Sequence, residues 1–201
     1  MLMKKIILPQ LLISHSKIFF FLSALFFVNL CTTHIGYSEE ARLKNMTVTN
    51  TRDYLICNFS IEGAFTKQIK EGILKGIPTS FSIFINLQLV RSLWFDKEIA
   101  DIEIIHTIKY NTLKKEFYIT LNEKSDEPVI IKDFKEAQKL MESIVNFKVI
   151  SLKELDKGKE YQLEAKTMLS EVTLPLYLHY ILFFVSFWDF ETSWHSINFI
   201  Y

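Results

Sequence analysis

The stretch Phe81-Ser-Ile-Phe-Ile-Asn-Leu-Gln-Leu-Val90 places an apolar residue at every second position through most of its length. An alternation of period two is typical of a β-strand with one face buried in a core. A second alternating row runs from Ala100 to Tyr110, after a turn at residues 94–97. Two such rows joined by a short turn predict a long antiparallel hairpin, and residues 117–121 extend it by another strand.

Two amphipathic helices are predicted where apolar residues recur every three or four positions, over residues 65–75 and 133–145. Gly76 directly follows the first pattern and is a typical helix stop. Asp133 precedes the second pattern, with Glu136 three residues later, which is the usual arrangement at a helix N-terminus. The helix over residues 133–145 is therefore predicted with both its cap and its apolar face.

Further alternation over residues 46–61, 161–169 and 194–201 predicts more strands. Residues 176–188 are apolar on all sides and follow Pro175, which suits the first turn of a helix. This run of about 13 residues is shorter than the about 20 that a bilayer span needs. We predict an α+β fold: an antiparallel curved sheet or β-sandwich of about seven strands, with two amphipathic helices and one apolar C-terminal helix.

The N-terminus has the order of a secretory signal. Three lysines precede or adjoin an apolar run at residues 18–31, and small residues lead to Ser38. We predict a signal peptide over residues 1–38, either cleaved after Ser38 or kept as an anchor. Residues 39–201 are then a single extracytoplasmic α+β domain, periplasmic or associated with the inner membrane.

Charge and length limit the classes of partner. The 201-residue chain has 23 Lys and Arg and 23 Asp and Glu, and three of the basic residues lie in the first 38 positions, which leaves 20 basic against 23 acidic ones. Nucleic-acid binding needs a positive field, so we expect no nucleic-acid partner. A domain of about 160 residues also folds without a disulfide or a metal.

No motif in the sequence indicates a catalytic or metal site. His106, His179 and His195 each lie on a predicted strand or helix, without a second ligand at a fixed short spacing. Cys57 alternates with apolar residues, which predicts a small buried side chain and not a reactive thiol. We therefore expect no cofactor, and we favour a non-enzymatic role over an enzyme.

Aromatic residues crowd together near the C-terminus. Such a cluster packs into a core, faces lipid or lines an apolar pocket. The candidate contacts with a ligand or membrane are Phe183, Phe184, Phe187, Trp188 and Trp194.

Several short segments occur in an order typical of one family. Among them are Leu74-Lys-Gly-Ile-Pro78, Leu93-Trp-Phe-Asp96, Gly158-Lys-Glu-Tyr161, Ser186-Phe-Trp-Asp189 and Thr192-Ser-Trp194. In their order and spacing the chain resembles domain-of-unknown-function family 4390, a family of exported bacterial proteins. The resemblance implies a signal peptide and an extracytoplasmic domain, and it transfers no activity, cofactor or catalytic residue.

Three functional hypotheses follow. The first is a non-enzymatic envelope module that binds an unknown envelope protein or lipid, with peripheral membrane contact. The second is a carrier whose curved sheet encloses a lipid or other apolar ligand. The third is a hydrolase-like enzyme that uses acids such as Asp96 and Asp189, and it requires these carboxylates to converge in one cleft. Turn capping is the commoner role for an Asp beside aromatic residues in a loop.

Overall fold

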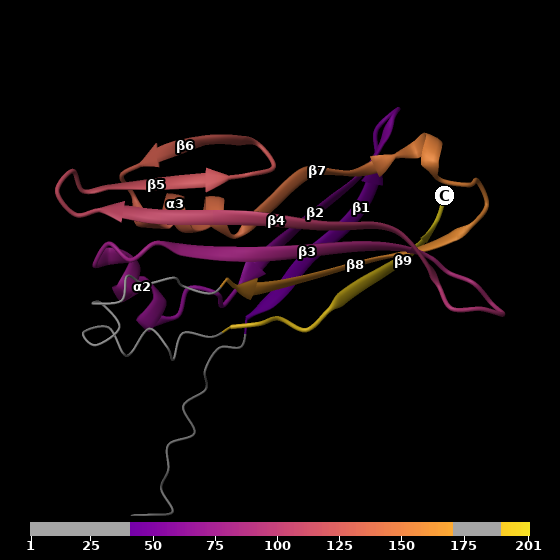
Figure 1. The fold of residues 1–201 in the computed structure, drawn as a ribbon, viewed down its shortest axis with the longest axis horizontal. Helices are drawn as coiled ribbons and strands as arrows, with labels where there is room; N and C mark the ends of the chain where they lie inside the picture. The colour runs from indigo at the N-terminus through magenta and orange to yellow at the C-terminus, as the bar shows by residue number, and fades with distance from the viewer. Residues whose placement is uncertain (1–40, 171–189) are drawn as a thin grey trace, which may run out of the picture. The chain divides into compact units, whose positions relative to one another are not determined.

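The computed structural model describes residues 41–170 and 190–201. The described residues all belong to one compact unit, Glu39–Tyr201. They contain nine strands in two antiparallel sheets, with two α-helices and one short 3-10 helix (Figure 1). This composition confirms the predicted α+β class.

The larger sheet has six strands in the order β6-β5-β4-β3-β8-β9, and every neighbouring pair is antiparallel. The predicted hairpin is its centre, because Ile83 lies opposite Ile104 and Phe81 lies opposite His106. The strands are β3 (Thr79–Leu89), β4 (Lys97–Asn111), β5 (Glu116–Leu121), β6 (Ser125–Ile131), β8 (Glu160–Leu169) and β9 (His195–Ile200).

The smaller sheet is built from β1 (Arg42–Asn50), β2 (Tyr54–Glu62) and β7 (Ser143–Ser151), with β2 in the middle. Both outer strands shift register beside Asn58 of β2, and Asn45 and Asn146 adopt positive φ there. Asn tolerates this conformation better than most residues. The Asn58 carboxamide oxygen accepts the Asn146 backbone N–H at 2.7 Å, which ties one bulge to the central strand.

The first predicted helix is confirmed as α2 (Lys67–Leu74). Its N-terminus is capped by Thr66, whose hydroxyl accepts the Ile69 N–H at 3.3 Å. At its C-terminus Gly76 has φ +88°, and the Ile77 N–H reaches back to the Gly72 carbonyl at 3.1 Å. This left-handed ending is the reason that glycine suits the position.

The second helix, α3 (Phe134–Met141), is shorter than the predicted 133–145. Asp133 caps it as predicted, because its carboxylate accepts the Glu136 N–H at 2.9 Å. The predicted end was wrong: the chain enters β7 at Ser143, and Ile144 pairs with Phe59 of β2. The apolar residues that extended the helical pattern belong to a strand, so pairing with β2 overrides the local period.

The core lies between the six-stranded sheet and a second layer that consists of the two helices and the three-stranded sheet. Helix α3 packs against β4, β5 and β6, α2 packs against β4, and β1 packs against β8 and β9. The alternating rows of β3 and β8 are buried on this side, including Ile83, Ile85 and Leu163. The described residues form nine strands in two sheets, where the sequence predicted a curved sheet or sandwich of about seven strands. β6 was missed because it begins with a polar Ser-Asp-Glu-Pro stretch, and β7 because residues 143–145 continue the helical spacing.

The chain leaves β8 after Ser170 and rejoins the same strand at Phe190. The Leu169 N–H donates to the Phe190 carbonyl at 2.9 Å, and the Thr192 N–H donates to the Thr167 carbonyl at 2.8 Å. The predicted apolar helix over residues 176–188 lies outside the described residues. Within residues 41–170 and 190–201, no helix has the length and apolar character to cross a membrane.

Candidate functional site

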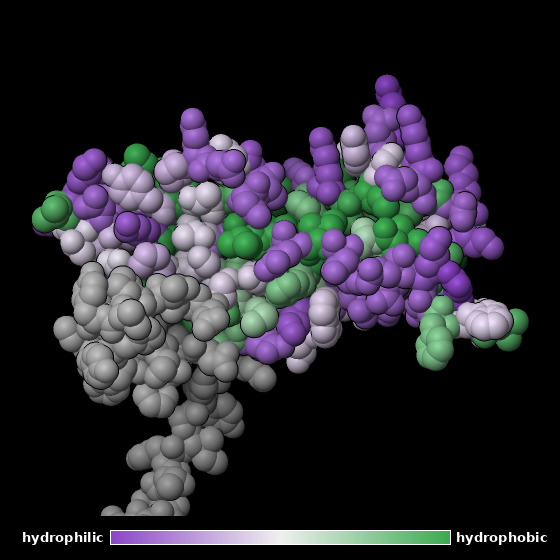
Figure 2. All heavy atoms as spheres, viewed as in Figure 1, coloured by the Kyte–Doolittle hydropathy of each residue, from purple (hydrophilic) through white to green (hydrophobic). Residues whose placement is uncertain are grey.

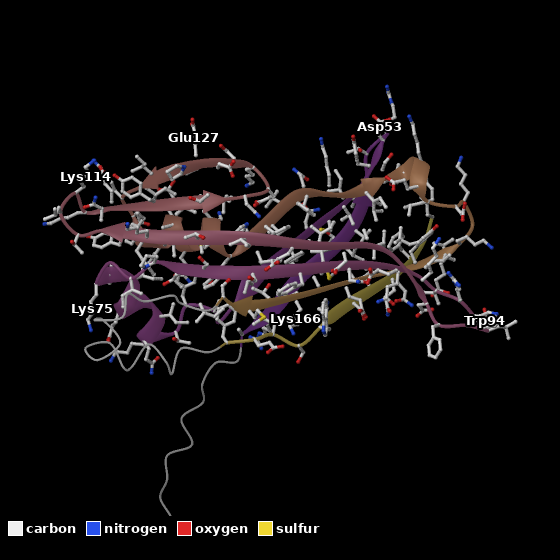
Figure 3. All side chains as sticks on the ribbon, viewed as in Figure 1. Asp53, Lys75, Trp94, Lys114, Glu127 and Lys166 are labelled. Carbon is white, nitrogen blue, oxygen red and sulfur yellow. The ribbon has the colours of Figure 1, made fainter. Side chains whose placement is uncertain are left out.

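The tip of the β3–β4 hairpin carries three consecutive large apolar side chains in water. Leu93, Trp94 and Phe95, here called the apolar tip, are 90%, 78% and 95% exposed. None of them belongs to the core or to the partly buried residues packed against it in the described part of the chain. In Figure 2 the hairpin end stands away from the domain surface at the lower right, and Figure 3 labels Trp94 there.

The base of the hairpin tip is held by hydrogen bonds. The Arg91 backbone N–H donates to the Asp96 carboxylate at 2.8 Å, and the Val90 N–H donates to the Glu160 carbonyl of β8 at 3.0 Å. Asp96 is thus a turn cap, as the commoner explanation for its position predicted. The local structure therefore fixes the two ends of the loop and leaves its apolar side chains outside.

Two cations flank the apolar tip, with Arg91 two residues before it and Lys97 two residues after it. Both are exposed, and neither forms an ion pair with another described residue. The carboxylates nearest in sequence are engaged: Asp96 caps the turn, and Glu98 accepts the Asn86 side-chain amide at 3.1 Å. The hairpin end thus presents an apolar tip with a basic rim.

His106 forms the one buried polar pair of the inner face of β4. Its side chain is fully buried, its Nδ1 lies 2.9 Å from the Met141 carbonyl, and its Nε2 lies 3.2 Å from Glu123 Oε1. A carbonyl oxygen only accepts, so Nδ1 carries a hydrogen, and a second proton must lie between Nε2 and the carboxyl group. The pair therefore joins the end of α3 to the turn between β5 and β6.

The pKa of Glu123 reflects two opposed effects. Burial raises it, but the hydrogen bond and charge interaction with His106, together with smaller contributions, outweigh burial and lower the pKa below its ordinary value. The second carboxylate oxygen, Oε2, is buried and has no hydrogen-bond partner among the described residues. The group is thus held as a carboxylate by His106 in particular.

Cys57 is a structural residue. It is fully buried on β2, and burial raises the pKa of its thiol to about 12. A thiol with such a pKa is protonated at neutral pH and is a poor nucleophile. The predicted role as a small buried side chain is confirmed.

The predicted aromatic contacts are described only in part. Phe183, Phe184, Phe187 and Trp188 lie outside the described residues. Trp194 is 49% exposed just before β9, and the Lys166 ammonium lies 5.5 Å from its ring centroid.

Trp194 and the apolar tip belong to different parts of the sheet. Lys166, which contacts Trp194, lies opposite Phe84 on β3, whereas Tyr161 of β8 lies opposite Leu89, next to the tip. An ion pair between Lys166 and Glu191 adds to the local order around Trp194. Trp194 is therefore half-buried because its ring contacts Lys166 of β8 at the edge of the sheet formed by β8 and β9.

The described residues do not form the cluster of carboxylates that the hydrolase hypothesis requires. Asp96 caps the hairpin turn, Asp189 lies outside the described ranges, and Glu191 pairs with Lys166. Over residues 41–170 and 190–201, no group of three or more His, Cys, Asp and Glu side chains is arranged to hold a metal ion. His195 is exposed at the start of β9, and His179 is outside the described residues.

Comparison with models of protein families identifies the family of the chain. The model described as Domain of unknown function (DUF4390) matches residues 38–198. The chain belongs to the DUF4390 family. Neither the curated proteins nor the solved structures that were searched gave a match. No functional residues are therefore transferred to this DUF4390 domain from a relative.

The sequence predicts a turn at residues 94–97 and a candidate acid at Asp96, but it does not single out the apolar tip as a binding surface. The available signal was three large apolar residues between two long alternating strands, where turn residues are usually polar or glycine. Three large apolar side chains are not needed to form a tight turn. That mismatch distinguishes the tip of the DUF4390 domain from an ordinary hairpin end.

Proposed function

We propose that this DUF4390 domain is a non-enzymatic binding module of the cell envelope, and that the apolar tip is its binding surface. The observation that carries the proposal is the exposure of Leu93, Trp94 and Phe95, each at least three-quarters exposed. Isolated apolar residues are common on protein surfaces, but contiguous ones typically indicate an interaction site. The proposal includes export of residues 39–201 by the N-terminal segment.

The hairpin favours binding over a role in folding. Leu93, Trp94 and Phe95 contribute nothing to the described core, whereas hydrogen bonds of Arg91 and Val90 already fix the base of the loop. Exposed aromatic side chains on a fixed turn lose little conformational entropy on binding, since they have few rotatable bonds. A preformed tip of this kind suits a binding module.

The alternatives receive less support from the described residues. A carrier with a ligand against the curved sheet needs open space at its inner face, but Ile83, Ile85 and Ile104 there are buried by the second layer of the domain. A hydrolase needs converging acids, and Asp96 is engaged as a turn cap. Both remain hypotheses of a different class from the binding module.

Site-specific photo-crosslinking in intact cells tests the proposal. A photoreactive phenylalanine analogue is placed at position 94 of the tagged full-length chain, and at position 113 as the matched control. Leu113 is 93% exposed in the turn at the opposite end of β4. We expect adducts to protein or lipid at position 94 in the envelope fraction, and none at position 113.

Two results would contradict the proposal. Recovery of the intact tagged chain in the cytosol would rule out the envelope location. Equal crosslinking at positions 94 and 113 would show that exposure alone, and not the tip, accounts for the adducts.

A further inference from the structure

The composition of the hairpin end matches the layers of a membrane surface. Leu93 and Phe95 are apolar, and Trp94 combines an apolar ring with an indole N–H. Trp is enriched where a membrane protein meets the headgroup layer, because its ring is buried while its N–H remains hydrated. The sequence of the tip thus suits a position between water and acyl chains.

The basic rim lies at a depth that fits phosphate groups. Arg91 and Lys97 each stand two residues behind the tip, one on each strand side of the loop. Residues 92–94 form a bend, so two residues here span less than the about 7 Å of a fully extended pair. Apolar groups of peripheral membrane proteins enter the interface by about 5–10 Å, so the two cations would reach the headgroups while the tip enters the acyl boundary.

The two cations of the basic rim favour an anionic surface, while Asp96 and Glu98 keep their negative charges beside them. Neither Arg91 nor Lys97 has an ion-pair partner among the described residues, and the Asp96 carboxylate is directed to the Arg91 backbone N–H. Cations near an anionic bilayer are attracted by its surface potential. A phosphate-rich surface offers partners to both cations at once, wherever the hairpin lands.

We propose that the β3–β4 hairpin inserts its apolar tip into the interface of an anionic phospholipid bilayer, with Arg91 and Lys97 on the lipid phosphates. This inference rests on the proposed function, because it names the partner of the same binding surface. It places the contact at residues 91–97, whereas the sequence indicated aromatic residues near the C-terminus.

Fluorescence quenching in vesicles tests this contact with the full chain. The protein is reconstituted into vesicles of phosphatidylglycerol or phosphatidylcholine, each with and without brominated acyl chains. The chain has three tryptophans, so the signal of Trp94 is obtained as the difference between wild type and Trp94→Phe. The matched control moves the reporter to the opposite end of β4 in the double variant Trp94→Phe/Leu113→Trp.

We expect brominated lipid to quench the Trp94 signal in phosphatidylglycerol vesicles and to leave the signal of the Trp at position 113 unchanged. Substitution of both cations, Arg91→Gln/Lys97→Gln, should weaken docking about thirtyfold in these vesicles. The variant should show little change in phosphatidylcholine. Circular dichroism confirms that each variant is folded.

Trp94 quenched by acrylamide and not by brominated lipid would overturn the inference, since the tip would then be in water. Protection of Trp94 from both quenchers would also overturn it, in favour of a protein surface such as a second copy of this chain. In either case, selective protein adducts at position 94 in cells would leave the proposed function intact. Absence of such adducts as well would reject both proposals.

Discussion

Strand β4 and its hairpin contain two exceptions to the usual distribution of polar and apolar groups. In the middle of the strand, the polar His106 is completely buried, where it contacts Glu123 and the Met141 carbonyl. At its beginning, the apolar Trp94 and its neighbours are exposed, without contacts to the described core. Figure 1 shows β3 and β4 as a pair of long neighbouring strands.

The two exceptions differ in what the fold provides for them. Both ring nitrogens of His106 have partners, so its burial follows from satisfied hydrogen bonds that join α3 to the sheet. The apolar tip has no such explanation within the described residues. A buried polar group with partners indicates stability, whereas exposed apolar groups without partners indicate interaction.

Replacement of His106 by alanine should have the largest effect on stability. The change removes both hydrogen bonds of the ring and leaves the Glu123 carboxylate buried with neither oxygen paired. We expect the free energy of unfolding to fall by about 3 kcal/mol, as for other broken buried pairs. Urea denaturation measures it, with the exposed His195→Ala as control. Equal effects of the two substitutions would contradict the structural role of His106.

Glu123→Gln should have a smaller effect that depends on pH. Because His106 helps to hold the pKa of Glu123 below its ordinary value of 4.5, the ionised carboxylate stabilises the fold above that pH. This contribution is lost as pH falls through the lowered pKa of the folded state. We expect a loss of about 1–2 kcal/mol at pH 7, and convergence with wild type in acid. A difference that does not vary between pH 7 and pH 3 would contradict this explanation.

Glu142→Gln should raise the free energy of unfolding at pH 7, whereas Glu123→Gln should lower it. Burial raises the pKa of this carboxyl group, although hydrogen bonds from Gln138 lower it. A raised pKa favours the protonated group in the folded state, so the stabilising contribution is present below pH 4.5 and is lost as pH rises through the folded pKa. We expect the neutral glutamine to raise stability at pH 7 by about 0.5 kcal/mol or less, since the site is partly exposed. Thermal unfolding at pH 7 and pH 4 measures it, and a gain at pH 4 as large as at pH 7 would be inconsistent.

The triple substitution Leu93→Ser/Trp94→Ser/Phe95→Ser should have the smallest effect on stability. The three side chains are exposed, and such surface changes usually alter the free energy of unfolding by about 0.5 kcal/mol or less. Chemical denaturation of this variant and of Phe81→Ser, in the buried row of β3, gives the comparison. A loss from the tip variant that matches the loss from Phe81→Ser would show that the tip is part of a core.

The sequence predicts elements where one period dominates. The rows of β3, β4 and β8 were clear because each strand has one buried face, and the two helices were located from their apolar spacing and caps. It failed where two patterns overlap: Ile144 and Val145 continue the helical spacing of α3, although pairing with β2 places them in β7. A distant partner strand cannot be read from a local period.

The site was predicted less well than the fold. Burial of Cys57 and capping by Asp96 and Asp133 were predicted correctly, because each depends on neighbouring residues. The buried pair of His106 and Glu123 was not predicted, since its members are 17 residues apart and meet only when β4, β5 and the following turn assemble. The composition of the apolar tip is visible in the sequence, but only the structure shows that its residues do not pack against the described core.

The order of strands in the smaller sheet affects how the chain folds as it is made. β1 and β2 are adjacent in sequence, but β7 begins only at Ser143, so β2 has one unpaired edge until more than half of the chain has been synthesised. At about 5–20 residues per second, roughly 80 residues take several seconds. An unpaired strand edge is a site of aggregation. Until β7 arrives, the free edge of β2 is therefore open to pairing with another chain, and late completion of this sheet is a step at which aggregation competes with folding.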